Sequence, residues 1–312
     1  MTGLELSREF FRTAGEPMLR ELFPEERHLI AAGLAGQGSE CFGFDDELSR
    51  DHDFGVDFCL WIPDELADTL GPRLQDAYFR LPRPDGAQVD SYVTPERARR
   101  IGVHTIGGFF RQHIGRSDAP TDPMDWIRIP ERYLAEAVNG EVFSDPLGEF
   151  TAIRRALLDF YPEDVIKKKL AADCAVMAQA GQYNYPRALQ RRDFGSAYLA
   201  CSEFVRAALA ALYLLNGRYM PFYKWAFRGT QSFLLGTDCA QSIRTLALTP
   251  DLTAGKEKTD RIEEICAFVA GELVRRGWSD EGDSFMQYHA QQLMERIDHP
   301  GLRQMYIMAG GI

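Results

Sequence analysis

The sequence predicts an α+β protein, with a mixed sheet and flanking helices in the first part of the chain and an all-α helical bundle after it. Short apolar runs of strand length alternate with Gly, Pro and Asp before about residue 145. After about residue 150, apolar residues recur at spacings of three and four, which is typical of helices. The chain has 312 residues and no internal repeat, so we expect two domains, residues 1–150 and 151–312.

Four apolar runs of the first part are predicted strands, because they are short, rich in β-branched and aromatic residues, and bounded by turn residues. They are residues 28–36, 54–62, 87–93 and 125–129. Between the second and third runs, Leu66, Leu70 and Leu74 have the spacing of a helix that Pro63 can open.

Five segments of the second part are predicted to be amphipathic or buried helices. They are residues 151–160, 162–180, 194–216, 258–277 and 281–297. Their Leu, Ala and Met stripes are expected to form the core of the bundle. The three consecutive lysines at 167–169 are expected to lie on a solvated face.

Charge and cysteine content narrow the class of protein. The chain has 46 acidic and 35 basic residues, so its average surface repels the phosphate backbone of a long nucleic acid. A nucleotide is not excluded, because a metal ion can bridge carboxylates to phosphates.

The six cysteines form no C-x-x-C pair, and neither a signal-peptide pattern nor a long apolar run is visible. We expect a cytoplasmic protein with reduced thiols and no membrane partner; its oligomeric state is open.

Two aspartates, Asp51 and Asp53, flank His52 at the entrance to the predicted strand 54–62. Alternate residues of a strand share a face, so the two carboxylates point the same way and His52 points the other way. Two close carboxylates with no basic residue between them are best stabilised by a divalent cation, and all-oxygen ligands favour Mg²⁺ or Mn²⁺. The pair therefore predicts a site for a hard metal ion.

Gly38 and Ser39 follow the predicted strand 28–36. A Gly-Ser turn after a strand exposes backbone N–H groups, and the serine hydroxyl adds a donor, so such a turn can hold phosphate oxygens. Asp90 is a lone acid within the predicted strand 87–93. If that strand lies beside the strand of the metal pair, three carboxylates converge, and the third ligates a metal or takes a proton from an attacking hydroxyl.

These residues together resemble the DNA polymerase β-like nucleotidyltransferase superfamily. Its pattern is an apolar strand, Gly-Ser, a short spacer, Asp-x-Asp and a distal Asp, which here stand as GLAGQGS, SRDHDFGVDF and VDSYV. The stretch GSECFGFDDELSRDHDFGVDFCLWI also looks like the bacterial DUF4037 branch, as does the later WIRIPERYLAEAVNGEVFSDPLGEFTAIRRALLDFYPEDV. A strand-rich catalytic domain before a helical domain is similar to the adenylyltransferases that modify aminoglycosides and lincosamides.

The resemblance implies a metal-dependent nucleotidyltransferase that uses a nucleoside triphosphate as co-substrate. It assigns the nucleotide phosphates to Gly38 and Ser39. It assigns two Mg²⁺ ions to Asp51 and Asp53, with Asp90 as the third carboxylate. An acceptor hydroxyl on a small molecule, an RNA or a protein then attacks the α-phosphate, and pyrophosphate leaves.

The sequence departs from the family pattern at two points. His52 stands where an apolar residue is usual between the paired aspartates. Residues 103–106 are an alternative for the strand that family members use for the third acid, and Asp145 is then the nearest candidate for that acid.

Three basic residues of the second part are candidate contacts for the triphosphate. Arg187 and Arg191 have near-helical spacing, and Arg binds phosphate bidentately, although a solvated basic turn explains them equally well. Lys224 lies in NGRYMPFYKW, which resembles the lysine segment after a helix in antibiotic adenylyltransferases.

Two other functional classes stay open. One is a catalytically inactive, nucleotide-binding or regulatory member of the same fold, which the intact Gly-Ser and Asp-x-Asp motifs disfavour. The other is an HD-type phosphohydrolase, suggested by His28 and by His52 next to Asp53, which the strand-like context disfavours. No P-loop and no G-x-S-x-G motif is present.

Overall fold

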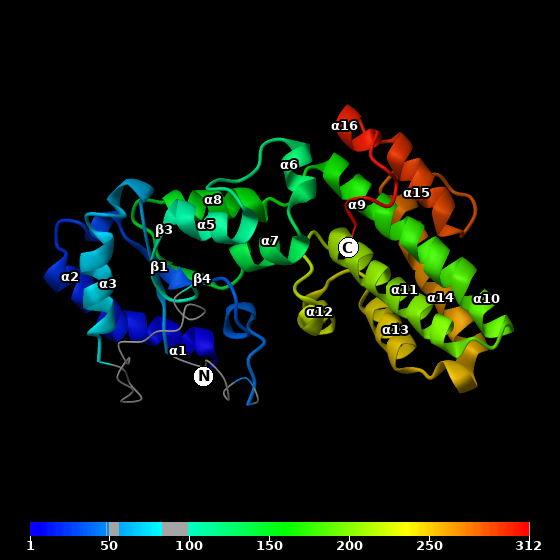
Figure 1. Cartoon of the computed structure of the whole chain (residues 1–312), viewed down its shortest axis with the longest axis horizontal. Coiled ribbons are helices and arrows are strands. Elements are labelled where there is room, and N and C mark those ends of the chain that lie inside the picture. Colours follow the sequence, from blue (N-terminus) through cyan, green and yellow to red (C-terminus); the bar gives the residue numbers. More distant parts are fainter. Residues whose placement is uncertain (48, 50–55, 83–98, 312) are drawn as a thin grey trace. The chain divides into compact units, whose positions relative to one another are not determined.

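The computed structural model describes residues 1–47, 49, 56–82 and 99–311 (Figure 1). Its internal contacts divide the chain into two compact units. The sheet unit comprises Met1–Ala119 and Tyr133–Asp159, and the helical unit comprises Pro120–Arg132 and Phe160–Ile312. The chain therefore passes between the units more than once, and the single boundary expected after residue 150 stays a prediction.

The sheet unit contains a four-stranded mixed sheet in the order β3-β2-β1-β4. Its strands are β1 (Ala31–Leu34), β2 (Cys59–Ile62), β3 (Gly102–Thr105) and β4 (Glu141–Ser144). β1 pairs antiparallel with both β2 and β4, whereas β2 and β3 are parallel. The predicted strands 28–36 and 54–62 contain β1 and β2, and the predicted strand 87–93 lies outside the described residues.

Helices cover both faces of this sheet. They are α1 (Gly3–Phe10), α2 (Glu16–Leu22), α3 (Gly71–Phe79), α5 (Ile106–Ile114), α7 (Glu131–Val138) and α8 (Glu149–Leu158), with a π turn at Phe11–Gly15. Side chains of β2 alternate between the faces. Phe58 and Leu60 join a core formed with α1 and α3, while Trp61 stacks on Phe150 of α8 with ring centroids 3.9 Å apart. Burial on both faces explains why this strand is continuously apolar.

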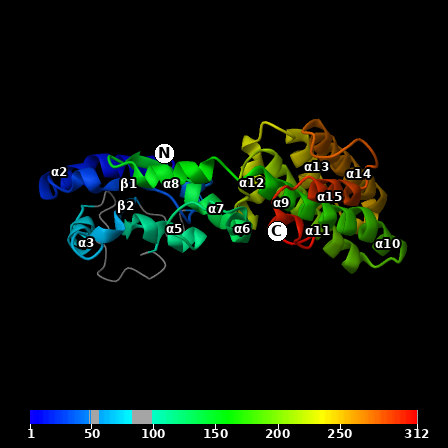
Figure 2. The same cartoon turned by 90° about the horizontal axis from the view of Figure 1, so that it is seen from above.

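The helical unit is a bundle, which confirms the α+β class with a helical second part. Its helices are α6 (Pro123–Arg128), α9 (Glu163–Val176), α10 (Tyr185–Gln190), α11 (Phe194–Leu215), α12 (Tyr223–Gly229), α13 (Thr237–Leu248), α14 (Asp251–Arg275), α15 (Met286–Glu295) and α16 (Pro300–Arg303). Helices α9, α11, α14 and α15 pack side by side (Figure 2). By length and composition α11 is apolar enough to cross a membrane, but a core helix passes the same test, and 67% of its apolar window is buried in the unit.

The predicted strand at 125–129 is wrong, because most of this segment forms α6. The Asp122 side chain caps the helix by accepting a hydrogen bond from the Met124 N–H at 2.8 Å. Pro123 occupies the first turn, where its fixed φ favours a helix and its missing N–H is not needed. The apolar residues Trp126 and Ile127 are buried, so the run is a short core helix rather than a strand.

The prediction that the lysines at 167–169 are solvated is also wrong. Lys167, Lys168 and Lys169 are buried, with exposed fractions of 8%, 0% and 5%. Each ammonium donates to backbone carbonyls of the C-terminal segment: Lys168 to Ile307 (2.9 Å) and Ala309 (2.5 Å), Lys169 to Gly310 (3.1 Å), and Lys167 to Arg296 (3.0 Å). A buried ammonium needs such acceptors, and helical periodicity along α9 cannot reveal acceptors that come from the far end of the chain.

Candidate functional site

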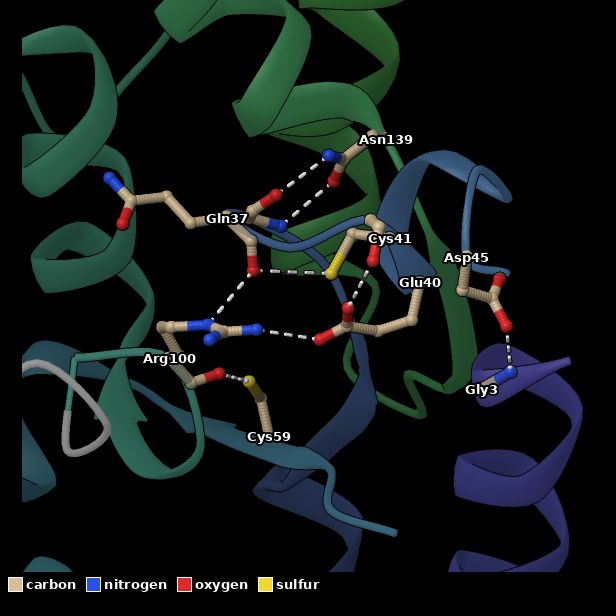
Figure 3. Close-up of polar contacts among 10 residues, drawn as sticks. Gly3, Gln37, Glu40, Cys41, Asp45, Cys59, Arg100 and Asn139 are labelled. Carbon is tan, nitrogen blue, oxygen red and sulfur yellow. Dashed lines mark hydrogen bonds and ion pairs between the residues drawn. The ribbon is translucent and has the colours of Figure 1, made fainter. Parts of the chain in front are cut away.

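The loop that follows β1 carries Gly38 and Ser39 and is fixed at its base. The Asn139 side chain bonds the backbone of Gly36 twice, accepting from its N–H at 2.8 Å and donating to its carbonyl at 2.7 Å. A little further along, the Gly140 N–H donates to the Cys41 carbonyl at 2.7 Å. The connection between α7 and β4 therefore holds the start of the Gly-Ser loop in one position (Figure 3).

An ion pair between Arg100 and Glu40 closes over Gly38. Arg100 Nη2 lies 2.7 Å from Glu40 Oε1, and Arg100 Nε donates to the Gln37 carbonyl at 3.2 Å (Figure 3). The side chains of Arg100 and Glu40 are only 20% and 15% exposed, so the pair is weakly screened by water. Sequence analysis missed both residues, although the basic dipeptide Arg99–Arg100, one residue before β3, was a visible signal.

Gly38 cannot be replaced by a residue with a side chain without local movement. Its φ of +135° is a conformation that other residues rarely adopt. A Cβ at this position would lie 2.5 Å from Glu40 Oε1 and 2.7 Å from Arg100 Nη2. The glycine is therefore required both by the backbone and by the ion pair that crosses it.

Ser39 lies at the start of the 3₁₀ turn Glu40–Phe42. Its carbonyl accepts from the Phe44 N–H at 2.8 Å, and its hydroxyl lies 3.4 Å from Glu40 Oε2. Ser39 thus sits directly beside the Glu40–Arg100 pair. An anion that binds at this loop meets the Arg100 guanidinium as an attractive group and the Glu40 carboxylate as a repulsive one.

The strand pairing brings three chain segments to the same edge of the sheet. β1 and β2 are antiparallel with Gly33 opposite Cys59, so the end of β1 lies beside the start of β2. β2 and β3 are parallel with Cys59 opposite Gly102, so the start of β3 lies there too. This explains how Arg100 reaches the Gly-Ser loop. Its carbonyl also accepts a hydrogen bond from Cys59 Sγ at 3.1 Å (Figure 3).

Asp57 lies two residues before β2 and is buried at this edge of the sheet, with an exposed fraction of 4%. The Tyr78 hydroxyl donates a hydrogen bond to Asp57 Oδ1 at 2.9 Å. The same hydroxyl accepts a hydrogen bond from the Phe58 N–H at 3.3 Å. Asp57 is thus tied to α3. Of the carboxylates predicted to bind metal, Asp51 and Asp53 stand earlier in the sequence and Asp90 stands later.

Asp51, Asp53 and Asp90 lie outside the described residues, so their roles as metal ligands and catalytic acids stay predictions. Among residues 1–47, 49, 56–82 and 99–311, no group of three or more His, Cys, Asp or Glu side chains is arranged to hold a metal ion. The strand alternative at 103–106 corresponds to β3 over Gly102–Thr105.

Asp145, the alternative third acid, has a different local role. It follows β4, and the pairing of Ser144 with Ala32 places it toward the end of the sheet away from the Gly-Ser loop. Its carboxylate accepts from the N–H groups of Gly148 (3.0 Å) and Thr151 (2.8 Å) at the start of α8. These bonds make it a helix-capping residue.

The basic candidates belong to the helical unit. Arg187 and Arg191 line the same pocket of about 490 Å³, together with Asp193 and Glu203, and the Arg187 guanidinium lies 4.0 Å from the Tyr183 ring centroid. Lys224 does not line that pocket, and its ammonium lies 5.0 Å from the Trp225 ring centroid. The structure therefore brings the two arginines together, and their role in binding a triphosphate stays a prediction.

The thiols near the loop do not have the character of nucleophiles. Burial raises the pKa of Cys41 well above its usual value and that of Cys59 to about 12. A thiol acts as a nucleophile in its deprotonated form, so both cysteines stay protonated at neutral pH. Their Sγ atoms instead donate to the backbone, Cys41 to the Gln37 carbonyl at 3.7 Å.

Comparison with known proteins supports the resemblance for part of the chain. Residues 126–226 match the family described as a domain of unknown function, DUF4037, which confirms the predicted likeness to that family over this segment. The segment begins after the Gly-Ser loop and the three aspartates, so it leaves their roles open. No curated protein matches the chain.

One solved structure is similar over most of the chain. It is the crystal structure of a nucleotidyltransferase-like protein from Exiguobacterium sibiricum 255-15, with a TM-score of 0.40 and 11% sequence identity. The match covers 92% of this chain and 81% of that chain. A likeness of this size says nothing about activity, which has to be argued from the residues themselves.

Proposed function

We propose that the protein is a metal-dependent nucleotidyltransferase, which moves a nucleoside monophosphate from a nucleoside triphosphate to an acceptor hydroxyl. The observation that carries this proposal is the edge of the sheet where the Gly-Ser loop, the start of β2 and the start of β3 meet. The segment with Asp51 and Asp53 joins this loop to β2 in the sequence, and the segment with Asp90 precedes β3. Phosphate-binding and metal-binding groups are therefore expected on adjacent segments.

The loop residues suit the binding of a nucleotide. A phosphate chain at Gly38 and Ser39 would accept hydrogen bonds from backbone N–H groups and from the serine hydroxyl. Arg100, held 2.7 Å from Glu40, supplies a fixed guanidinium beside them, and guanidinium groups bind phosphate in a bidentate way. The pair with Glu40 keeps the guanidinium in position before the nucleotide arrives.

The three predicted aspartates would bind the metal ions and accept a proton. Asp51, Asp53 and Asp90 would form an all-oxygen donor set, which suits Mg²⁺ or Mn²⁺, and the bound ions would neutralise charge on the phosphates. Asp90 is assigned to take the proton of the acceptor hydroxyl. The acceptor oxygen then forms a bond to the α-phosphorus, the bond from the α-phosphorus to the α–β bridging oxygen breaks, and pyrophosphate leaves with that oxygen.

The test is an acceptor search with nucleoside triphosphates labelled at either the α- or the γ-phosphate. The full-length protein is incubated with Mg²⁺, each labelled nucleotide and a cell extract divided into small molecules, RNA and protein. Nucleotidyl transfer moves the α-label to an acceptor and leaves the γ-label in pyrophosphate. The double variant Asp51→Asn, Asp53→Asn is expected to lose transfer. Asp46→Asn, an exposed acid of the same loop that accepts from the Ser49 N–H, is expected to keep it.

Three outcomes would contradict the proposal. Transfer that survives the double variant or complete chelation of divalent ions would remove the metal mechanism. Thermal stabilisation by a nucleotide with no label transfer to any fraction would instead favour the inactive, nucleotide-binding member of the fold. Release of inorganic phosphate from a phosphate ester, with no nucleotide requirement, would favour a phosphohydrolase.

A further inference from the structure

The helical unit contains a pocket of about 710 Å³ that is separate from the pocket of Arg187 and Arg191. Its walls come from the end of α6 and the segment after it, from α9 and α11, from the turn before α12 with α12 itself, and from the C-terminal Gly310 and Gly311. Apolar side chains dominate these walls, among them Ile129, Leu209, Met220, Phe222 and Phe227. A volume within about 300–1,000 Å³ and apolar walls are typical of a site for a small molecule.

A buried ion pair fixes the position of these walls. Glu131 and Lys169 are 7% and 5% exposed, and Glu131 Oε2 lies 3.4 Å from Lys169 Nζ. Glu131 Oε1 also accepts from the Met220 N–H at 2.7 Å, and Lys169 donates to the Gly310 carbonyl at 3.1 Å. The pair thus ties α9 to the turn before α12 and to the C-terminal segment, so the pocket exists before any ligand binds.

The charges around the pocket are mostly positive, in contrast to the whole chain. Among the described residues, its lining includes the cations of Arg128, Arg132, Lys169 and Arg206 and one anion, Glu131, whereas the chain has 46 acidic and 35 basic residues. Lys169 is neutralised by Glu131. The other three cations are guanidinium groups, and that of Arg132 lies 5.7 Å from the Phe222 ring centroid.

Among the described residues, two of these guanidinium groups have loose acidic partners. Arg128 lies 3.8 Å from Asp125, and Arg206 lies 3.4 Å from Glu203, and both acids are outside the lining. The side chains of Arg128 and Arg206 are 71% and 51% exposed, so they can turn toward a ligand at small cost. The pocket therefore combines an apolar interior with a cationic rim.

We propose that this pocket binds a small amphipathic anion, with an aromatic or aliphatic body inside and a carboxylate, sulfonate or phosphate group at the arginines. The apolar walls would bury the body, and guanidinium groups pair with planar or tetrahedral oxyanions. A cationic ligand would be repelled by the rim, and a neutral one would leave the arginines unused. Because all the lining residues belong to the helical unit, binding here does not require nucleotidyl transfer.

The test compares two dyes with the same kind of apolar body. Anilinonaphthalene sulfonate carries an anionic group, and N-phenylnaphthylamine does not. Both are titrated into the full-length protein and followed by fluorescence. We expect one saturable site for the sulfonate and binding of the neutral dye at least about tenfold weaker, which corresponds to about 1.4 kcal/mol.

Four variants assign the binding to this pocket. Arg206→Ala is expected to weaken the sulfonate severalfold and to leave the neutral dye unchanged. Arg275→Ala is the matched control, because Arg275 also pairs with a glutamate three residues earlier but does not line the pocket. Ser202→Trp, at an exposed lining position of α11, is expected to block both dyes. Arg206→Lys, which keeps the charge, is expected to retain most of the affinity for the sulfonate.

The results that overturn the proposal are equally definite. Equal affinity for both dyes, or equal effects of the Arg206 and Arg275 variants, would remove the preference for an anion. Sulfonate binding that is unchanged in Ser202→Trp would place the dye elsewhere. An unfolding midpoint measured for each variant ensures that fluorescence reports on folded protein, and binding that appears only on unfolding would also refute the site.

Discussion

Replacement of Gly38 by alanine tests how tightly the loop is built. In the structure, an added Cβ would lie 2.5 Å from Glu40 Oε1 and 2.7 Å from Arg100 Nη2, at a φ of +135°. Backbone strain of this kind costs about 1–3 kcal/mol. Displacing a charge-assisted hydrogen bond between side chains that are 20% and 15% exposed adds about 1–2 kcal/mol. We expect Gly38→Ala to lower the free energy of unfolding by about 3 kcal/mol.

The assay is urea denaturation of the full-length protein, with the slope fitted as well as the midpoint. Gly43 in the same loop is the control, because it has a φ of +66° and a Cβ there meets no atom within 4 Å. Gly43→Ala should cost only the left-handed strain, about 1 kcal/mol. In a Glu40→Ala background, the cost of Gly38→Ala should fall by about 1 kcal/mol, since one of the clashing groups is gone. Equal costs for Gly38→Ala and Gly43→Ala would refute the reasoning that an ion pair crosses the glycine.

Three further predictions follow from buried polar groups. Burial lowers the pKa of Lys168 from its usual 10.5 to about 8, so between these pH values the unfolded chain holds a proton that the folded chain lacks. The free energy of unfolding of the wild type, measured relative to that of Lys168→Met, should therefore rise between about pH 8 and pH 10, by at most about 3 kcal/mol. A difference between the two proteins that does not change with pH would contradict this. Asn139→Ala removes both hydrogen bonds to Gly36, so hydrogen exchange of the Gly36 amide should become at least about tenfold faster while amides of α11 keep their rates. All six cysteines are buried, so a thiol reagent at neutral pH should modify them only after denaturation, and one thiol that reacts at once in the native protein would show an accessible site.

The strands β1 and β2 of the sheet unit could be predicted from local patterns in the sequence. The apolar runs at 28–36 and 54–62 contain β1 and β2, and the glycine and serine that follow the first run form a loop at the sheet edge. These patterns depend on short-range chemistry, namely side-chain alternation and turn residues, which a single sequence displays. The run at 125–129 was assigned wrongly, because a short buried helix and a short buried strand have the same apolar composition and only the Asp122–Pro123 cap distinguishes them.

The parts that sequence analysis missed depend on contacts between distant segments. The lysines at 167–169 are buried because backbone carbonyls of residues 296–310 accept hydrogen bonds from their ammonium groups. The sequence of α9 contains no sign of those acceptors. The cationic pocket has the same origin, since Lys169 and Glu131 meet only when α9 packs against the segment that follows α6.

The pairing of the strands brings the positive charge of Arg100 to the candidate site. The sequence offered residues 103–106 as an alternative strand, and the structure has the strand β3 there, parallel to β2. Once β3 starts opposite Cys59, the residues just before it must arrive at the edge where the Gly-Ser loop lies, and Arg100 is among them. The Gly-Ser loop therefore lies against the Arg100 guanidinium, which pairs with Glu40 and which sequence analysis did not place there. An incoming phosphate would compete with the Glu40 carboxylate for that guanidinium, so the affinity of this loop for anions depends on Glu40 as much as on Gly38 and Ser39.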